Sequence, residues 1–241
     1  MKKILAIQGS PRGRSGNTDV MLQEFLRGAQ SIGAQTETIY LKKMNIHHCT
    51  GCYGCWAKTP GKCVLKDDMA DLLEQVRLSD LLVLATPVYV YSMTSLMKAC
   101  IDRMLPLIEP HFVQEGDRFK HPSRYKRSYD TVLISNCGFP DMNQFDALRH
   151  NFRLREELGH TVMVGELLMP AGVLLNVEGL KDFLSDHFKA FFQAGEEVVE
   201  TGRIHPETEQ AVQKLIFKPE DFFEMANKIW DEKLVAARNR T

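Results

Sequence analysis

Apolar runs alternate with stretches of helical periodicity over the first 170 residues of the chain. Five short apolar runs predict strands over residues 3–8, 36–41, 81–85, 129–135 and 161–168. Apolar residues spaced three and four apart predict helices over residues 18–32, 68–78, 95–108 and 141–158. Residues 81–85 are apolar without interruption, which is typical of a strand buried on both faces of a parallel sheet.

This alternation of strands and helices predicts an α/β fold with a doubly wound, five-stranded parallel sheet and right-handed crossovers. We expect the flavodoxin-like strand order 2-1-3-4-5. In such a sheet a ligand lies at the carboxyl ends of the strands, where the strand order reverses. The loops at residues 9–18, 87–92 and 136–140 should therefore face one crevice. Segment 41–66 follows the second strand, so we expect it near the same edge.

Two segments exceed this minimal fold. Residues 109–128 are polar and basic, and their histidines, lysines and arginines are His111, Arg118, Lys120, His121, Arg124, Lys126 and Arg127. Residues 176–238 predict two or three further helices with phenylalanines at helical spacing. These helices either cap the core or form a subunit interface. We expect a flavodoxin-like domain over residues 1–172 and a C-terminal helical extension over residues 173–241.

Composition narrows the possible partners and location. The chain has 30 lysines and arginines and 31 aspartates and glutamates, so its net charge of −1 offers no basic excess for nucleic acid. No apolar run is long enough to span a bilayer, and the first one stops at Gln8, too short for a signal peptide. We therefore expect a cytoplasmic protein without nucleic-acid or membrane partners.

The loop after the first predicted strand has the features of a phosphate site. Its glycines allow a tight turn and a close approach of backbone N–H groups to an anion, and the next helix adds the positive end of its dipole. Short donors and positive charges stand in the same loop: Ser10, Arg12, Arg14, Ser15, Asn17 and Thr18. The Walker pattern and the dinucleotide fingerprint both fail on spacing. The alternative is an ordinary glycine-rich turn that caps a helix.

The loop after the third predicted strand, residues 86–92, combines aromatic and aliphatic side chains with backbone groups. At the switch point of the sheet such a loop suits a flat apolar ligand. The alternative is a loop that buries its two tyrosines against its own domain.

Together these motifs resemble the NADPH-dependent FMN reductase and iron–sulfur flavoprotein family over roughly residues 3–170. The resemblance rests on G-S-P-R-x-x-S-G-N-T, on P-V-Y, and on residues 96–103, L-x-K-x-x-I-D-R. It implies noncovalent FMN and a homodimer or homotetramer with FMN near an interface. By that resemblance the cofactor-binding residues are Ser10, Arg12, Ser15, Gly16, Asn17, Thr18, Pro87, Val88, Tyr89, Val90 and Gly138. We assign Asp102 and Arg103 to ordering their helix or the interface, and not to catalysis.

Four of the six cysteines lie within fifteen residues, at Cys49, Cys52, Cys55 and Cys63. Three thiolates spaced by two residues, with a fourth from the returning chain, are what a [4Fe–4S] cluster requires. The gap of seven residues before Cys63 departs from the ferredoxin pattern but resembles the compact motif of iron–sulfur flavoproteins. Zinc on these cysteines, with or without His47 or His48, a thiol-based or empty site, and a disulfide remain as alternatives. We expect Cys100 in the core and give Cys137 no role.

These features predict an FMN-dependent oxidoreductase. The flavin carries out the hydride or electron transfer, so no acid–base pair is required and no catalytic side chain is named. Electrons would come from NAD(P)H or a ferredoxin-like donor and pass to a small-molecule or protein acceptor. One rival is an electron-transfer protein that relays electrons without turning over a small substrate. Another is a flavin-free regulatory module with a zinc or empty cysteine site.

Overall fold

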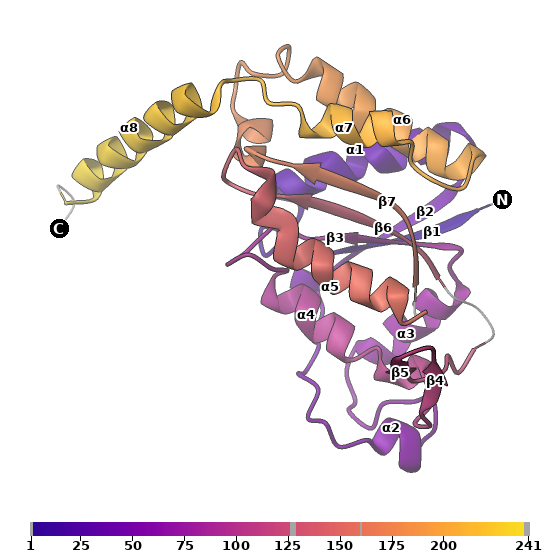
Figure 1. Cartoon of the computed structure of the whole chain (residues 1–241). Helices are drawn as coiled ribbons and strands as arrows, with labels where there is room; N and C mark the ends of the chain where they lie inside the picture. The colour runs from indigo at the N-terminus through magenta and orange to yellow at the C-terminus, as the bar shows by residue number, and fades with distance from the viewer. Residues whose placement is uncertain (1, 126–128, 160, 239–241) are drawn as a thin grey trace.

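The structure is a computed structural model that describes residues 2–125, 129–159 and 161–238. Lys126 and Arg127 of the basic segment lie outside the described residues. Five parallel strands form one sheet in the order β2-β1-β3-β6-β7 (Figure 1). Their bounds are Lys3–Gln8 for β1, Gln35–Tyr40 for β2, Leu81–Ala85 for β3, Tyr129–Asn136 for β6 and Thr161–Met169 for β7. The predicted flavodoxin-like order is confirmed, and each strand lies within one residue of its predicted bounds.

Helices cover both faces of the sheet (Figure 1). One face carries α1 (Asn17–Ser31), α6 (Ser185–Glu200) and α7 (Pro206–Gln213), and the other carries α3 (Met69–Leu78), α4 (Ser95–Asp102) and α5 (Asp146–Glu157). Successive strand residues point to opposite faces, so Ile4 and Ala6 join the core under α1 while Leu5 and Ile7 join the core under α3. Two separate apolar cores therefore hold the sheet.

Two predicted helices are shorter than expected. The helix predicted over residues 95–108 ends at Asp102, and the chain continues as a 3-10 turn over Leu105–Leu107. Pro106 explains this difference, because proline lacks an N–H and restricts the residue before it to non-helical conformations. The helix predicted over residues 141–158 begins as a 3-10 turn at Met142–Phe145 and becomes α-helical only from Asp146.

Two glycines let α1 and α6 cross in direct contact. A Cβ atom at Gly28 would lie 1.8 Å from the carbonyl oxygen of Phe192. A Cβ atom at Gly195 would lie 1.9 Å from the carbonyl oxygen of Phe25. Each glycine thus faces backbone of the other helix, which cannot move aside as a flexible side chain would. This contact joins α6 to the sheet across the predicted boundary at residue 172, and that boundary stays a prediction.

We expect Gly195→Ala to lower the free energy of unfolding by about 3 kcal/mol, because the added methyl group must push the two helices apart. Urea unfolding followed by circular dichroism measures this loss. Lys189→Ala is the matched control, since Lys189 lies on the exposed side of α6 with only a surface ion pair to Asp186, and it should change stability by less than about 0.5 kcal/mol. Equal stability of the two variants would contradict the close contact.

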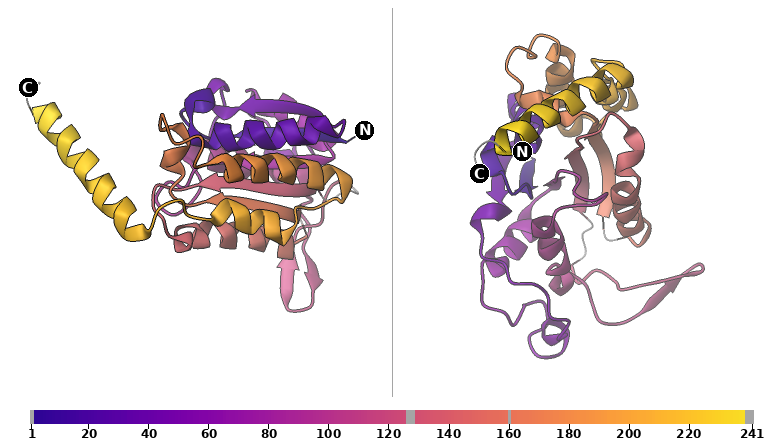
Figure 2. Two further views of the ribbon diagram at one scale, coloured as in Figure 1. Left: turned by 90° about the horizontal axis from the view of Figure 1, so that it is seen from above. Right: turned by 90° about the vertical axis from the view of Figure 1, so that its left-hand side faces the viewer.

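The remaining elements project from this body. α2 (Gly54–Ala57) lies in the cysteine segment, and the hairpin of β4 (Val113–Glu115) and β5 (Arg118–Lys120) lies in the basic segment (Figure 2). α8 (Pro219–Arg238) extends away from the sheet (Figure 1 and the left view of Figure 2). Among the described residues, no helix is both long enough and apolar enough to cross a membrane.

Candidate functional site

The loop that follows β1 is fixed by hydrogen bonds of its own. Gln8 is fully buried, its Nε2 donates to the carbonyl of Gly13 (3.2 Å), and its Oε1 accepts from the amide of Ser10 (3.0 Å). Gly16 packs on the same residue, because a Cβ atom there would lie 2.9 Å from the Ser10 hydroxyl. The polar groups of this loop are therefore held in place by the protein itself.

The loop leads into an open helix N-terminus. α1 begins at Asn17, and no side chain caps it. The first amides of a helix have no carbonyl partner within that helix, and the helix dipole places positive charge at the same point. An anion such as a phosphate group fits this position.

One pocket collects residues from the three predicted loops. It is lined by Ser10, Arg12, Asn17, Thr18, Pro87, Val88, Tyr89, Asn136, Cys137, Gly138 and Val173. Most residues predicted to bind the cofactor are thus brought together at the carboxyl ends of β1, β3 and β6. The remaining three, Ser15, Gly16 and Val90, do not line this pocket. Their assignment as cofactor-binding residues stays a prediction, as does that of the residues that do line it.

The two arginines of the loop lie differently. Arg12 lines the pocket, whereas the guanidinium of Arg14 lies over the ring of Tyr40, 5.3 Å from its centroid. The hydroxyl of Ser15 donates to the carbonyl of Arg12 (3.0 Å) and so supports the loop. Arg12 is therefore the positive charge that faces the ligand position.

Two asparagines that the sequence did not single out support the pocket. Asn136 ends β6, and its Nδ2 donates to the hydroxyl of Thr18 (2.7 Å). Asn176 donates to the amide oxygen of Asn17 (2.5 Å), which leaves the NH2 group of Asn17 as the donor available to a ligand. The only sign in the sequence that Asn136 supports the pocket was its place as a polar residue after the apolar run 129–135. No neighbouring residue indicated such a role for Asn176.

The loop after β3 forms a tight and strained turn. Tyr89 and Ser92 exchange backbone hydrogen bonds of 2.8 and 3.1 Å, and the two residues between them have positive φ angles, 46° at Val90 and 64° at Tyr91. A β-branched residue in this conformation costs about 1–3 kcal/mol, and such strain collects at ligand-binding sites. Val90 is 91% exposed, so the turn presents an uncovered apolar tip beside the pocket.

The pocket has a volume of about 120 Å³, which is small beside the roughly 300–1,000 Å³ of a complete small-molecule pocket. It adjoins a second hollow of about 1,080 Å³, and the two share Gly138 and Val173. Phe139 and, from α8, Phe223 and Trp230 line this second hollow. The first pocket thus suits one end of a long ligand, whose remainder would extend over exposed apolar surface.

Burial raises the pKa values of two ionisable groups close to the pocket. Burial raises the pKa of the Cys137 thiol, which donates to the carbonyl of Phe139 (3.2 Å). Burial also raises the pKa of Asp19 in the first turn of α1, against smaller opposing contributions from Tyr40, Gln23 and Arg14. Cys137 therefore does not have the character of a reactive thiolate. Cys100 is buried in the core as predicted, and burial raises its pKa to about 12.

The cysteine segment and the basic segment pack on each other through aromatic rings. Trp56 of α2 stacks on Tyr53 and contacts His121, with ring centroids 5.3 and 4.8 Å apart. Phe112 also contacts His121, with ring centroids 4.9 Å apart. The indole N–H of Trp56 donates to the carbonyls of Leu105 and Ile108 beyond the end of α4. The basic segment therefore supports the cysteine loop, a role that its composition did not indicate.

All four cysteines of the loop are free thiols, so none of them forms a disulfide. Cys49 and Cys52 are exposed, Cys55 is buried and Cys63 is half-buried. Burial raises the pKa of Cys55, and the neighbouring thiols of Cys63, Cys49 and Cys52 add to the rise. The thiols of the loop thus act on Cys55 electrostatically. Yet among the described residues no three such groups converge closely enough to hold a single metal ion.

The cysteine loop does not stay at the edge where the flavin loops lie. It begins there, after β2, but its contacts run along α4 to the far end of that helix, where Arg103 donates to the carbonyl of His47 (2.7 Å). Arg103 pairs with Asp67, and the neighbouring Asp102 pairs instead with Lys98 at 2.6 Å. The two ends of α4 are about 12 Å apart at 1.5 Å per residue. The expectation that segment 41–66 lies near the crevice therefore holds only for its first residues.

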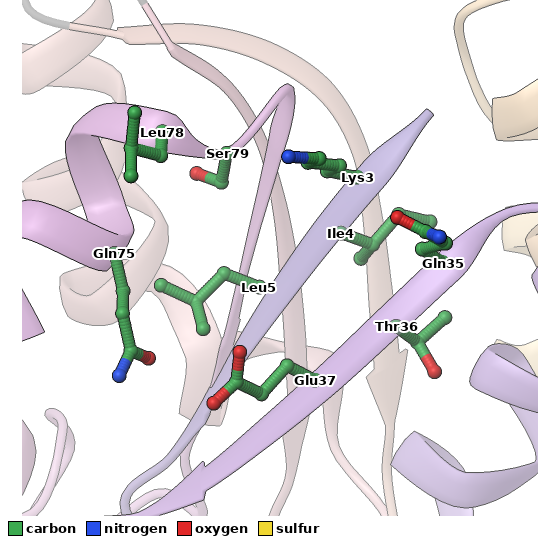
Figure 3. Close-up of a pocket in the computed structure, with 9 residues that line it drawn as sticks. All are labelled: Lys3, Ile4, Leu5, Gln35, Thr36, Glu37, Gln75, Leu78 and Ser79. Carbon is green, nitrogen blue, oxygen red and sulfur yellow. The ribbon is translucent and has the colours of Figure 1, made fainter. Parts of the chain in front are cut away.

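A further hollow lies at the opposite end of the sheet. It has a volume of about 530 Å³ and opens beside the first residues of β1 and β2, under α3. Figure 3 shows Gln75 of α3 and Glu37 of β2 on either side of Leu5. It contains none of the residues predicted to bind a cofactor or a metal. Its position at the amino ends of the strands also separates it from the edge where such sheets bind ligands.

Known proteins share part of this sequence and its fold. Residues 2–121 match the family model described as NADPH-dependent FMN reductase. An iron–sulfur flavoprotein of Archaeoglobus fulgidus is 43% identical over 104 residues, which cover 43% of this chain and 46% of that protein. The chain spans about half the length of the curated relatives that it matches.

Solved structures share the fold. An FMN-dependent NADH-azoreductase from Bacillus anthracis in complex with FMN has a TM-score of 0.60 at 14% identity, and the match covers 83% of this chain and all of that one. An NAD(P)H:quinone oxidoreductase from Methanothermobacter marburgensis has a TM-score of 0.59 at 13% identity, with 82% and 98% covered. At these identities the similarity shows the flavodoxin-like fold alone.

Proposed function

Residues 2–121 carry the sequence pattern of the NADPH-dependent FMN reductase family, and from that premise we propose that this protein is an FMN-dependent oxidoreductase with a second redox centre in its cysteine loop. The observation that carries the proposal is the pocket at the uncapped N-terminus of α1, where residues of three separate loops converge. A visible spectrum of anaerobically purified protein, with flavin, iron and zinc analysis, tests it. Colourless protein that takes up no added FMN would contradict it.

The residues of the pocket fit the phosphate end of FMN. The amides at the start of α1, the hydroxyls of Ser10 and Thr18, the NH2 of Asn17 and the charge of Arg12 suit a single dianionic group. The flavin ring would lie over Pro87 and Tyr89. The amides of Val90 and Tyr91, which bond to no other described group, are free to reach its polar edge. When bound, the flavin supplies hydride and electron transfer, and the protein supplies binding and orientation.

The spacing of the cysteines favours an iron–sulfur cluster over zinc. Three cysteines separated by two residues, with a fourth from the returning chain, suit four irons, whereas zinc sites usually pair two separated cysteine knuckles. The relatives named iron–sulfur flavoprotein support the same choice. Cys49, Cys52, Cys55 and Cys63 would be the ligands, and the buried N–H of Arg103 beside Cys63 suits a sulfur acceptor.

We propose NAD(P)H or a ferredoxin-like protein as the electron donor, and a quinone, oxygen or a protein as the acceptor. The second centre also favours the rival function, an electron-transfer protein that relays electrons between cluster and flavin without turning over a small substrate. Steady-state oxidation of NADH and NADPH separates the two functions. Turnover with either nucleotide supports the reductase, and reduction of the flavin by reduced ferredoxin alone supports the relay.

We further propose that α8 joins two copies of the chain in a homodimer or homotetramer. It projects away from the sheet (Figure 1), and it exposes Phe223, Trp230 and Leu234 at 65%, 61% and 52%. Such a helix is rarely left uncovered on a monomer. Its charges are mixed along its length, so its exposed apolar side chains are what a partner would cover. Two antiparallel copies of α8 would bring these apolar faces together.

We expect Phe223→Ser combined with Trp230→Ser to convert the oligomer into a monomer, because each change removes a large apolar contact of up to a few kcal/mol. Light scattering after size-exclusion chromatography measures the mass. Asp231→Ser, next to Trp230 but polar, is the control and should keep the oligomer. An unchanged mass for the double variant would show that α8 does not form the interface.

A further inference from the structure

Arg103, the residue that follows α4, is among the most deeply buried charged residues described. Its side chain is 1% exposed, and that of its partner Asp67 is 0% exposed. The pair is bidentate, with Nη1 to Oδ2 at 2.6 Å and Nη2 to Oδ1 at 2.8 Å. Burial acts to raise the pKa of Asp67, but the bonds from Arg103 and from the amides of His47 and Met69 outweigh it and lower the pKa to about 2. The pair is thus fully charged.

The Arg103–Asp67 pair joins the two ends of the cysteine loop. Asp67 follows the loop and accepts from the amide of His47, which precedes it, at 2.8 Å. Arg103 donates to the carbonyl of the same His47 at 2.7 Å. A second bond, from the amide of Asn45 to the carboxylate of Asp68 (2.7 Å), joins the same two segments. The segments on either side of the four cysteines are therefore fastened to one guanidinium.

The three bonds to His47 and Asp67 use three of the five N–H groups of that guanidinium, both on Nη1 and one on Nη2. The Nε nitrogen is buried and has no hydrogen-bond partner. The thiol of Cys63 is close enough to Arg103 to act on its guanidinium together with Asp67. A buried N–H without an acceptor is unfavourable. The sulfur of Cys63 is a possible acceptor beside this guanidinium, and a metal-bound thiolate accepts more strongly than a thiol.

Resting on the proposed iron–sulfur cluster, we propose that Arg103 is a positioning residue whose Nε–H donates to the sulfur of Cys63 when Cys63 is a cluster ligand. Such a bond stabilises the extra negative charge of the reduced cluster, so it raises the reduction potential. It also fixes the last ligand of the loop against α4. The other end of α4 is tied to the phosphate loop, because Thr94 donates to the carbonyl of Gly9 at 2.6 Å. One short helix thereby sets the distance between the two proposed redox sites.

The test uses full-length protein carrying FMN and reconstituted anaerobically with iron and sulfide. Arg103→Lys keeps the positive charge opposite Asp67 but removes the Nε–H. It is expected to take up about four irons per chain. Its cluster should have a more negative midpoint potential in an EPR-monitored redox titration. It should also lose iron to a ferrous chelator about 10–100-fold faster than wild type. FMN affinity should stay unchanged, because Arg103 does not line the flavin pocket.

Leu72→Ala is the control for general loosening, since Leu72 is a fully buried core residue of α3, close in sequence to the loop, and the change leaves charge unaltered. It should lower stability and leave the cluster potential at the wild-type value. Where Arg103→Lys fails to fold, Arg103→Gln combined with Asp67→Asn replaces the buried pair without a change in net charge. The same negative shift is expected there.

The outcomes separate the two proposals. A wild-type protein that takes up no iron overturns the cluster and this inference with it. A different outcome would overturn the role of Arg103 alone. In it, wild type takes up about four irons, and the cluster of Arg103→Lys has the wild-type potential and loses iron at the wild-type rate. A shift in Leu72→Ala as large as that in Arg103→Lys also overturns it, because loop packing would then explain both.

Discussion

Replacing Arg12 and Asn17 together with alanine is expected to weaken FMN binding about 100-fold. Both residues line the pocket at the start of α1, and each would donate a charge-assisted hydrogen bond to the phosphate. Such bonds contribute about 1.5–3 kcal/mol each, and the lower value applies here because Arg12 is exposed to water. A combined loss of about 3 kcal/mol corresponds to roughly two powers of ten in Kd. Titration of flavin-stripped protein with FMN, followed by quenching of flavin fluorescence, measures the change.

Arg14→Ala is the matched control for this variant. Arg14 stands in the same loop and carries the same charge, but it lies over Tyr40 and does not line the pocket. Its removal should change Kd only slightly. Equal affinities for wild type and the double variant would remove the phosphate assignment, and equal losses in the control and the double variant would reduce it to a general effect of loop charge.

The sheet could be predicted from the sequence because its pattern is local. Strands buried on both faces form short, uninterrupted apolar runs, and residues 81–85 are the clearest instance. Once the strands alternate with helices, handedness and the switch point leave few possible orders. The ends of helices were harder to predict. Apolar spacing alone extends the helix to residue 108, whereas Pro106 ends α4 earlier.

The pocket could be predicted only as far as its loops could be placed. Ser10, Asn17 and Thr18 follow a strand and begin a helix, so their position was set by the chain nearby. Asn136 and Asn176 reach the same pocket from distant parts of the chain. Their roles depend on side chains that meet only in the folded structure. A single sequence contains no local sign of such contacts.

The cysteine loop shows the same limit in another form. The spacing of the four cysteines indicated the kind of ligand, but their position relative to the flavin loops depends on the path of the chain after β2. The contacts of Trp56 with Leu105 and of Arg103 with His47 place the cysteine loop at the far end of α4. The partner of Arg103 was also missed, because Asp67 is 36 residues away along the chain.

Alanine at any one of Cys49, Cys52, Cys55 and Cys63 is expected to abolish formation of a complete cluster. A [4Fe–4S] cluster needs a ligand on each iron, and all four thiols come from one loop without a spare cysteine beside them. Anaerobic reconstitution followed by iron and sulfide analysis should give about four irons per chain in wild type and far fewer in each variant. FMN content should be equal in all of them, because no cysteine of this loop lines the flavin pocket.

Cys100→Ala is the control, since Cys100 is a fully buried core thiol outside the loop. Its iron content should match that of wild type. A wild-type protein that binds about one zinc and no sulfide would replace the cluster with a structural metal site. A protein that binds neither metal, and whose exposed Cys49 and Cys52 react rapidly with a thiol reagent, would leave an empty loop. Neither result would remove the proposed flavin site, because its residues belong to other loops and bind through other groups.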